Sequence, residues 1–234
     1  MFMEDRKAQR LQRERITLLK ERLPILRKVY NTCVETYPVN SIIPCVADVF
    51  KDPIVQDLLV RPCLSTTFTE KDLETLGALF PDIVCRWRNR TEEKLMNMIT
   101  PRQRPPKSLL FRLATTIFSC QRCNNDPLTY PQVLIHRCAT MFNPYGNADE
   151  EQMVVGRFLD CSNWNACNSI IFDVSKVVCL SEAIKLCGLN PKSATREDMD
   201  KQDPIFECLA CNDLRKGRCT LPWLGVVFLF YSIT

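Results

Sequence analysis

The chain has 234 residues and a mass of 27.1 kDa, of which 46% are hydrophobic and 25% are charged. This composition is that of a folded globular protein and excludes wholesale disorder, and the net charge of +4 is mild. Fifteen prolines against six glycines favour helices joined by rigid connections over a glycine-turned β-barrel.

The N-terminus shows no signal peptide, because charged residues begin at Glu4 without an apolar segment before them. No apolar stretch reaches the roughly 20 residues that a membrane-spanning helix needs. We therefore expect an intracellular protein, cytoplasmic or nuclear, with no membrane partner. In that setting the 14 cysteines are expected to be thiols and metal ligands rather than disulfides.

The first 37 residues are predicted to form one long helix. An apolar stripe with helical spacing runs along it, formed by Leu19, Leu23, Leu26, Tyr30 and Cys33. Pro24 is expected to kink this helix or to start a new one, because proline removes a backbone donor. The pair Tyr37-Pro38 is expected to end it.

Residues 41–100 are predicted to form shorter helices. Thr69 and Asp72 have the spacing of a capping box at a helix start. Pro81 fits the first turn of a following helix. Trp87 is interpreted as a core residue of that helix rather than as a stacking platform for a ligand.

A Pro-rich, basic segment at residues 101–108 is the clearest candidate linker. We expect it to separate a helical region, residues 1–100, from a cysteine-rich region, residues 109–234, which holds ten of the 14 cysteines. Within the second region, Pro131 is expected to open a short helix that carries His136. Residues 169–174 are predicted to be a strand, and a helix capped by Ser175 is predicted to stop at Gly188.

Two further short strands, residues 205–208 and 218–220, are predicted to pair around a turn at 212–217. The predicted fold class is therefore α+β, predominantly helical. It combines a helical N-terminal region with a cysteine-rich C-terminal region that resembles a zinc knuckle.

Four potential metal ligands fall within 19 residues. Cys120 and Cys123 form a Cys-x2-Cys pair, in which two thiolates in a tight turn can face one ion, and His136, the single histidine, and Cys138 follow. The spacing of His136 and Cys138 puts both on one side of an extended segment but about 200° apart on a helix. If the segment is helical, a more distant thiol must complete the site: Cys161, Cys167, Cys208 or Cys211. The plainer alternative is that the two cysteines are small buried side chains and His136 is a core histidine.

A second Cys-x2-Cys pair, Cys208 and Cys211, is followed by Cys219 but by no histidine. Three thiolates alone are an incomplete set for structural zinc. Either a fourth ligand comes from elsewhere in the chain, or the two pairs share one ion.

The pattern of these motifs resembles a group of uncharacterised basidiomycete fungal proteins, many of which carry an F-box ahead of the region. The resemblance rests on Phe118-x-Cys-x2-Cys, on Tyr-Pro-x-Val-Leu-x-His-x-Cys from Tyr130, on Phe206-x-Cys-x2-Cys and on Trp223. This chain shows no F-box signature, so the resemblance does not imply a ubiquitin-ligase adaptor. Similar proteins place a histidine after the last tryptophan. Here an apolar run, 224–234, follows instead, and we expect it to reflect a truncated C-terminus.

No Gly-x-Ser-x-Gly, His-Glu-x-x-His or phosphate-binding loop motif is present, and we expect a non-enzymatic protein. The expected function is a structural zinc site that supports an interaction surface for an unidentified protein partner. The alternative is nucleic-acid binding through a basic segment, whose candidate residues are Arg86, Arg88, Arg90, Arg102, Arg104 and Lys107.

Overall fold

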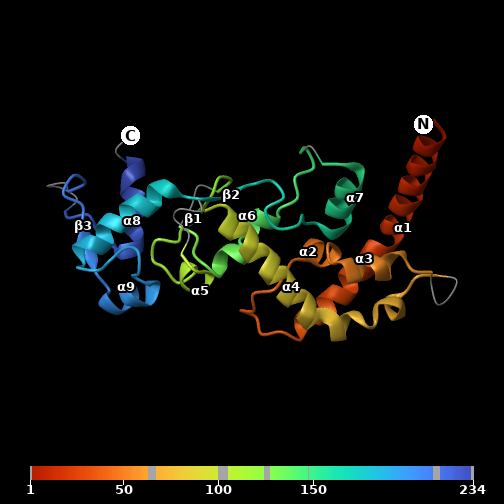
Figure 1. The fold of residues 1–234 in the computed structure, drawn as a ribbon, viewed down its shortest axis with the longest axis horizontal. Coiled ribbons are helices and arrows are strands. Elements are labelled where there is room, and N and C mark those ends of the chain that lie inside the picture. Colours follow the sequence, from red (N-terminus) through yellow and green to blue (C-terminus); the bar gives the residue numbers. More distant parts are fainter. Residues whose placement is uncertain are drawn as a thin grey trace. The chain divides into compact units, whose positions relative to one another are not determined.

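The computed structural model describes residues 2–62, 67–99, 105–123, 127–146, 148–212 and 217–232 (Figure 1). Over these residues it is predominantly helical, with strands of three residues each, which confirms the predicted α+β class.

The chain divides into two compact units, and each unit combines two segments of the sequence. The first unit comprises residues 1–93 and 134–169, and the second comprises residues 94–133 and 170–234. Residues 101–104 of the expected linker lie outside the described residues. The boundary expected there stays a prediction.

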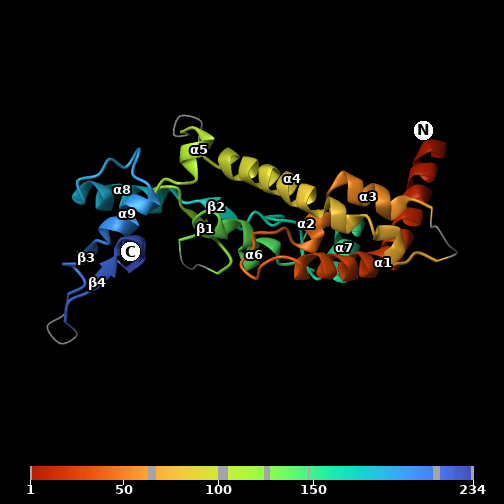
Figure 2. The same cartoon turned by 90° about the horizontal axis from the view of Figure 1, so that it is seen from below.

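The first unit is built around the long N-terminal helix α1, Phe2–Glu35. The expected apolar stripe is buried, with Leu23 and Leu26 fully inaccessible to solvent, because one face of the helix packs against the rest of the unit. The helix continues through Pro24, so the expectation of a new helix start there is wrong. It ends at Glu35, before the Tyr37-Pro38 pair that was expected to end it. Helix α7, Glu150–Leu159, lies alongside α1 (Figures 1 and 2).

Short helices fill the other sides of this core: α2 (Val46–Phe50), α3 (Pro53–Val60), the 3-10 turn η1 (Glu70–Leu73), the first part of α4 (Leu76–Asn97) and α6 (Arg137–Thr140). Apart from α6, these elements contribute apolar side chains to one cluster, which includes Val49, Phe50, Leu59, Leu73, Leu76, Phe80 and Ile83. Burial of this cluster from water is the main force that holds the first unit together.

The capping box at Thr69 and Asp72 is present, although it opens a 3-10 turn. Trp87 is buried, as expected. The prediction that Pro81 occupies the first turn of a helix is wrong, because α4 begins five residues earlier, at Leu76. Leu76 and Phe80 are both buried, and their packing keeps the preceding turn helical despite the missing proline donor.

The second unit holds two small antiparallel sheets. Strand β1, Phe118–Cys120, pairs with β2, Ile170–Phe172, so that Cys120 lies opposite Ile170. Strand β3, Ile205–Glu207, pairs with β4, Thr220–Pro222, and the two lie side by side in Figure 2. The strand predicted at 218–220 is thus shifted by two residues, and part of the predicted turn, 213–216, lies outside the described residues.

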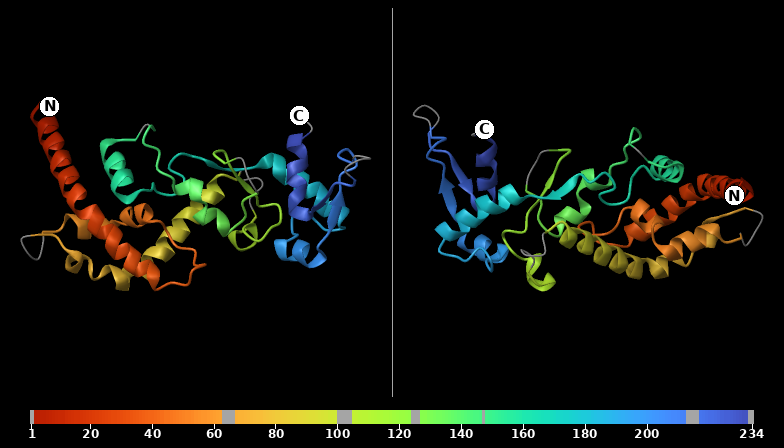
Figure 3. Two further views of the ribbon diagram at one scale, coloured as in Figure 1. Left: turned by 180° about the vertical axis from the view of Figure 1, so that it is seen from behind. Right: turned by 45° about the horizontal axis from the view of Figure 1, so that its top comes forward.

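Four helical elements complete the second unit: α5 (Lys107–Leu110), α8 (Val174–Leu186), α9 (Arg196–Gln202) and the 3-10 helix η4 (Trp223–Ser232). Helix α8 packs against η4, the blue helix at the C-terminus in Figure 3. The apolar C-terminal run thereby contributes Val226 and Val227 to a core with Leu180 and Ile184.

The expected strand at 169–174 and the helix that follows it are confirmed, and Gly188 has the left-handed backbone of a helix stop, with φ of 74°. The predicted cap is wrong. Asp173, not Ser175, caps α8, because its carboxylate accepts a hydrogen bond from the Lys176 backbone N–H.

Candidate metal centre

Strand β1 and the loop after it position the first Cys-x2-Cys pair. Phe118 exchanges two backbone hydrogen bonds with Leu128, at 2.9 and 2.8 Å, so the chain leaves β1 and returns beside it. Cys120 at the end of β1 is buried, and Cys123 in the turn is half-buried. The backbone pairing therefore fixes both ends of the loop from which these two thiols project.

The segment that carries the other two candidate ligands is not one continuous helix, so the helix expected to run from Pro131 through His136 is a wrong prediction. A 3-10 turn, η3, spans Gln132–Ile135, and α6 begins at Arg137. Between them His136 has extended backbone angles, φ −61° and ψ 122°, at the N-cap position of α6. This break removes the helical geometry that would have kept His136 and Cys138 apart.

The four side chains of this stretch come together: Cys120, Cys123, His136 and Cys138 each direct one ligand atom into a group whose atoms all lie within 4.8 Å of one another. Ligands held about 2.0–2.3 Å from a tetrahedral zinc ion lie about 3.3–3.8 Å apart. The separations between ligand atoms therefore exceed those of a closed tetrahedral site by no more than about 1.0–1.5 Å. In the described part of the chain it is the single group of three or more such ligands.

The donor set fits a metal ion by its chemistry. Three thiols and one imidazole make one of the usual four-ligand sets of structural zinc sites. Burial lowers the pKa of His136 from its usual range, which favours the neutral imidazole that binds metals. The set is complete without Cys161, Cys167, Cys208 or Cys211, the distant thiols that sequence reasoning kept as alternatives.

A buried polar network lies next to Cys120 on the same strand. The Ser119 hydroxyl donates to Asp173 Oδ2 at 2.6 Å and accepts from Lys176 Nζ at 2.6 Å. All three residues are buried. Burial alone would raise the pKa of Asp173, but hydrogen bonds from Ser119 and Lys176 and the Lys176 charge outweigh it and lower that pKa.

This network ties β1 to the first turn of α8, and sequence reasoning missed it. A signal was present, because Asp173 and Lys176 have the spacing of a helix cap with its N3 residue. Nothing in the sequence, however, indicates that Ser119, more than 50 residues earlier, lies between them.

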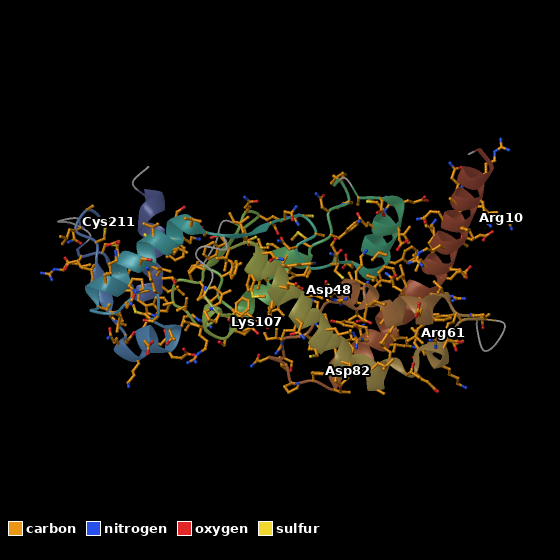
Figure 4. All side chains as sticks on the ribbon, viewed as in Figure 1. Arg10, Asp48, Arg61, Asp82, Lys107 and Cys211 are labelled. Carbon is orange, nitrogen blue, oxygen red and sulfur yellow. The ribbon has the colours of Figure 1, made fainter. Side chains whose placement is uncertain are left out.

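The second cysteine pair lies beyond β3, and Figure 4 labels Cys211 there. The Cys208 backbone N–H donates to the Cys219 carbonyl at 2.9 Å, and the Cys219 N–H donates to Asn212 Oδ1 at 2.9 Å. Hydrogen bonding to Cys208, together with burial and Cys219, raises the pKa of Cys211 to about 11. The same contact lowers the pKa of Cys208.

These three thiols therefore interact pairwise around Cys211. Among the described residues they do not form a group that meets the mutual distance of the first cluster, and no fourth ligand joins them. A second metal site here stays a prediction.

The three α4 arginines proposed for nucleic-acid binding contact other groups of the first unit. Arg86 binds both carboxylate oxygens of buried Asp52, at 2.9 and 3.1 Å, and Arg90 lies 3.9 Å from the same carboxylate. Arg88 donates to the Ile42 carbonyl at 3.0 Å. The α4 arginines thus hold the first unit together, because Asp52 also caps α3.

Three further candidates for nucleic-acid binding lie in the basic segment after α4: Arg102, Arg104 and Lys107. Lys107 is an exposed residue at the start of α5, and Arg102 and Arg104 lie outside the described residues. Nucleic-acid binding by this segment stays a prediction.

Comparison with known proteins adds no family to these observations. No protein-family model matches the chain, and neither a curated protein nor a solved structure matches it. None of the helices in the described residues combines the length and apolar character needed to cross a bilayer. The resemblance to fungal proteins noted from the motifs stays a prediction.

Proposed function

We propose that Cys120, Cys123, His136 and Cys138 bind one structural zinc ion. The observation that carries this proposal is the convergence of three thiols and one imidazole within 4.8 Å. Thiolates and imidazole together favour zinc over magnesium or calcium, which prefer oxygen ligands. Four protein ligands leave no open position for water or substrate, which is the arrangement of a structural site rather than a catalytic one.

The ion would stabilise the segment between β1 and α6. Strand β1 is three residues long and α6 is four, and elements of this length are marginal without further support. Zinc binding supplies free energy to the folded state alone, because the unfolded chain has no preformed site. The metal would therefore serve as the link that regular secondary structure does not provide here.

We further propose that the segment around His136 and Cys138 presents a surface to a protein partner, so that the protein acts without catalysis. Three apolar side chains that are close in the sequence to His136 and Cys138 are exposed: Ile135, Met141 and Tyr145. Exposed apolar and aromatic side chains held on a rigid segment are typical of interaction surfaces. In this proposal the metal keeps these three side chains in one arrangement.

The zinc content of the purified full-length chain tests the metal site. Elemental analysis is expected to find about one zinc per chain, released by a thiol-modifying reagent. Folded protein with less than about half an equivalent contradicts the proposal.

The interaction surface is tested separately, by comparing the proteins that bind to matched variants. Ile135→Asp should lose a partner that wild type retains. Ile205→Asp, which alters another exposed apolar residue in the β3–β4 hairpin, should keep it. Equal binding by both variants would reject the surface and leave the metal site intact.

A further inference from the structure

A second pair of cysteines, neither of which belongs to the four clustered ligands, meets inside the first unit. Cys45 precedes α2, and Cys161 follows α7 after Asp160, whose left-handed backbone (φ 57°) turns the chain. The Cys45 and Cys161 side chains interact directly, and the interaction changes the pKa of both. Cys45 Sγ lies 3.3 Å from Asp48 Oδ2 and 3.3 Å from the Ser162 carbonyl oxygen.

The two sulfurs have opposite surroundings. Hydrogen bonding to Cys161, burial and the Asp48 charge raise the pKa of Cys45 well above its usual value. At Cys161 the interactions with Cys45 and the Ala47 backbone and the Arg27 charge favour the thiolate. Together they outweigh burial and the Asp48 charge and lower the pKa of Cys161. One sulfur is thus held as a thiol and the other favours the thiolate.

The backbone around the pair is fixed. Asp48, labelled on α2 in Figure 4, accepts the Trp164 backbone N–H at Oδ1, 2.9 Å away, and is itself buried. The Ser162 backbone N–H donates to the Thr140 carbonyl at 2.8 Å, and the Asn165 backbone N–H donates to the Ala139 carbonyl at 2.7 Å. These bonds hold the segment that carries Cys161 against α6 and against α2, at whose N-cap Cys45 lies.

Cys161 is also accessible. It lines a cavity of about 780 Å³ in the first unit, together with Ala47 and Lys51. Most of the cavity's other lining side chains are polar, among them Gln12, Asn143, Asp149, Gln152 and Asn168. A small polar reactant can therefore reach the sulfur that favours the thiolate, whereas Cys45 does not line the cavity.

We propose that Cys161 reacts with small hydroperoxides that enter this cavity and reduces them, and that Cys45 resolves the product into a Cys45–Cys161 disulfide. The proposal rests on the paired sulfurs, the fixed backbone and the cavity, and it does not depend on zinc at the other cluster.

The chemistry balances in two steps. The Cys161 thiolate attacks the outer oxygen of the hydroperoxide and the O–O bond breaks. Sulfur loses two electrons and becomes a sulfenic acid, and the alkoxide leaves and takes a proton from solvent. Cys45 then attacks the Cys161 sulfur, the S–O bond breaks, and the disulfide forms. Asp48 accepts the Cys45 proton and passes it to the departing hydroxide, which leaves as water.

The test is made on the full-length, metal-loaded chain with less than one equivalent of hydrogen peroxide. Remaining thiols are alkylated, and peptides are analysed without reduction. The expected product is a Cys45–Cys161 disulfide, with zinc content unchanged. Cys167 is the internal control, because it lines the same cavity but is exposed and outside the pair.

Cys161 should be oxidised before Cys167, because Cys161 has Cys45 beside it to form a disulfide, whereas Cys167 lies outside the pair and should be recovered alkylated. Cys45→Ser should stop the reaction at a sulfenic acid on Cys161, which dimedone traps, and Cys167→Ser should change nothing. Oxidation of Cys161 no faster than Cys167 within the wild-type chain overturns the proposal, as does a disulfide between other residues. Neither result depends on a variant that folds.

Discussion

The two Cys-x2-Cys pairs of this protein share their local sequence and strand context but have different side chains around them. Each follows a phenylalanine, as Phe118-x-Cys and Phe206-x-Cys, and each lies at the end of a three-residue antiparallel strand. The first pair meets an imidazole and a third thiol within 4.8 Å. The second meets Cys219, and its three thiols share hydrogen bonds around Cys211.

The difference shows that the motif specifies half a site. A Cys-x2-Cys turn brings two sulfurs together wherever it occurs, but a tetrahedral ion needs two more ligands from a segment with the right backbone. At the first pair the backbone break at His136 supplies that segment. At the second pair, among the described residues, three thiols interact around Cys211 and no fourth ligand joins them.

The largest effect is expected from removing the imidazole. His136→Ala should lower the zinc content below about half an equivalent and the free energy of unfolding by more than about 3 kcal/mol, because zinc supplies about 10–16 kcal/mol in small zinc-binding peptides. His136→Cys should retain the metal, since four thiolates also bind zinc. Elemental analysis and denaturant unfolding measure both.

A histidine that is merely packed behaves otherwise. In that case His136→Ala would cost about 1–3 kcal/mol and leave the metal content unchanged. Equal zinc in wild type and His136→Ala would therefore remove His136 from the site.

An intermediate effect is expected from the polar network beside Cys120. Ser119→Ala removes the hydroxyl between Asp173 and Lys176 and leaves a buried carboxylate and ammonium with fewer partners. It should lower the free energy of unfolding by about 1–3 kcal/mol. Ser181→Ala, which removes a half-buried hydroxyl bonded to its own helix, is the control and should cost less.

The same network gives a pH dependence whose sign follows from Asp173. Its pKa is lower in the folded chain than in the unfolded one, so its stabilisation is present above the unfolded value, about 3.9, and is lost as the pH falls through the folded value. The stability difference between wild type and Asp173→Asn should shrink over that acidic range. A difference that is constant with pH would show that the carboxylate charge plays no part.

Much of the fold could be predicted because the signals were local. The apolar stripe from Leu19 to Cys33 lies within a single helix, and the capping box of Thr69 and Asp72 lies within a single turn. Both could be recognised from neighbouring residues alone. The four clustered ligands were also predictable, because they lie within 19 residues and differ chemically from their neighbours.

The rest depended on contacts between distant residues. Pro81 lies inside α4 because Leu76 and Phe80 are buried by other helices, which overrides the local preference of proline. Arg86 appeared free to bind an anion until the fold placed Asp52 against it. Cys45 and Cys161 carry no motif, and their pairing exists only after α2 and α7 have packed.

The smallest effect is expected at the second pair. Cys219→Ser should leave the zinc content near one per chain and change the free energy of unfolding by less than about 1 kcal/mol, because the altered sulfur is half-buried on a short hairpin. The backbone bonds that join Cys219 to Cys208 and Asn212 do not involve the sulfur and should persist. With one hydrogen-bonding partner fewer, Cys211 should react faster with an alkylating reagent at pH 9, because Cys219 contributes to its raised pKa. Loss of a second equivalent of zinc on Cys219→Ser would contradict this prediction, and it would mean that both pairs complete metal sites.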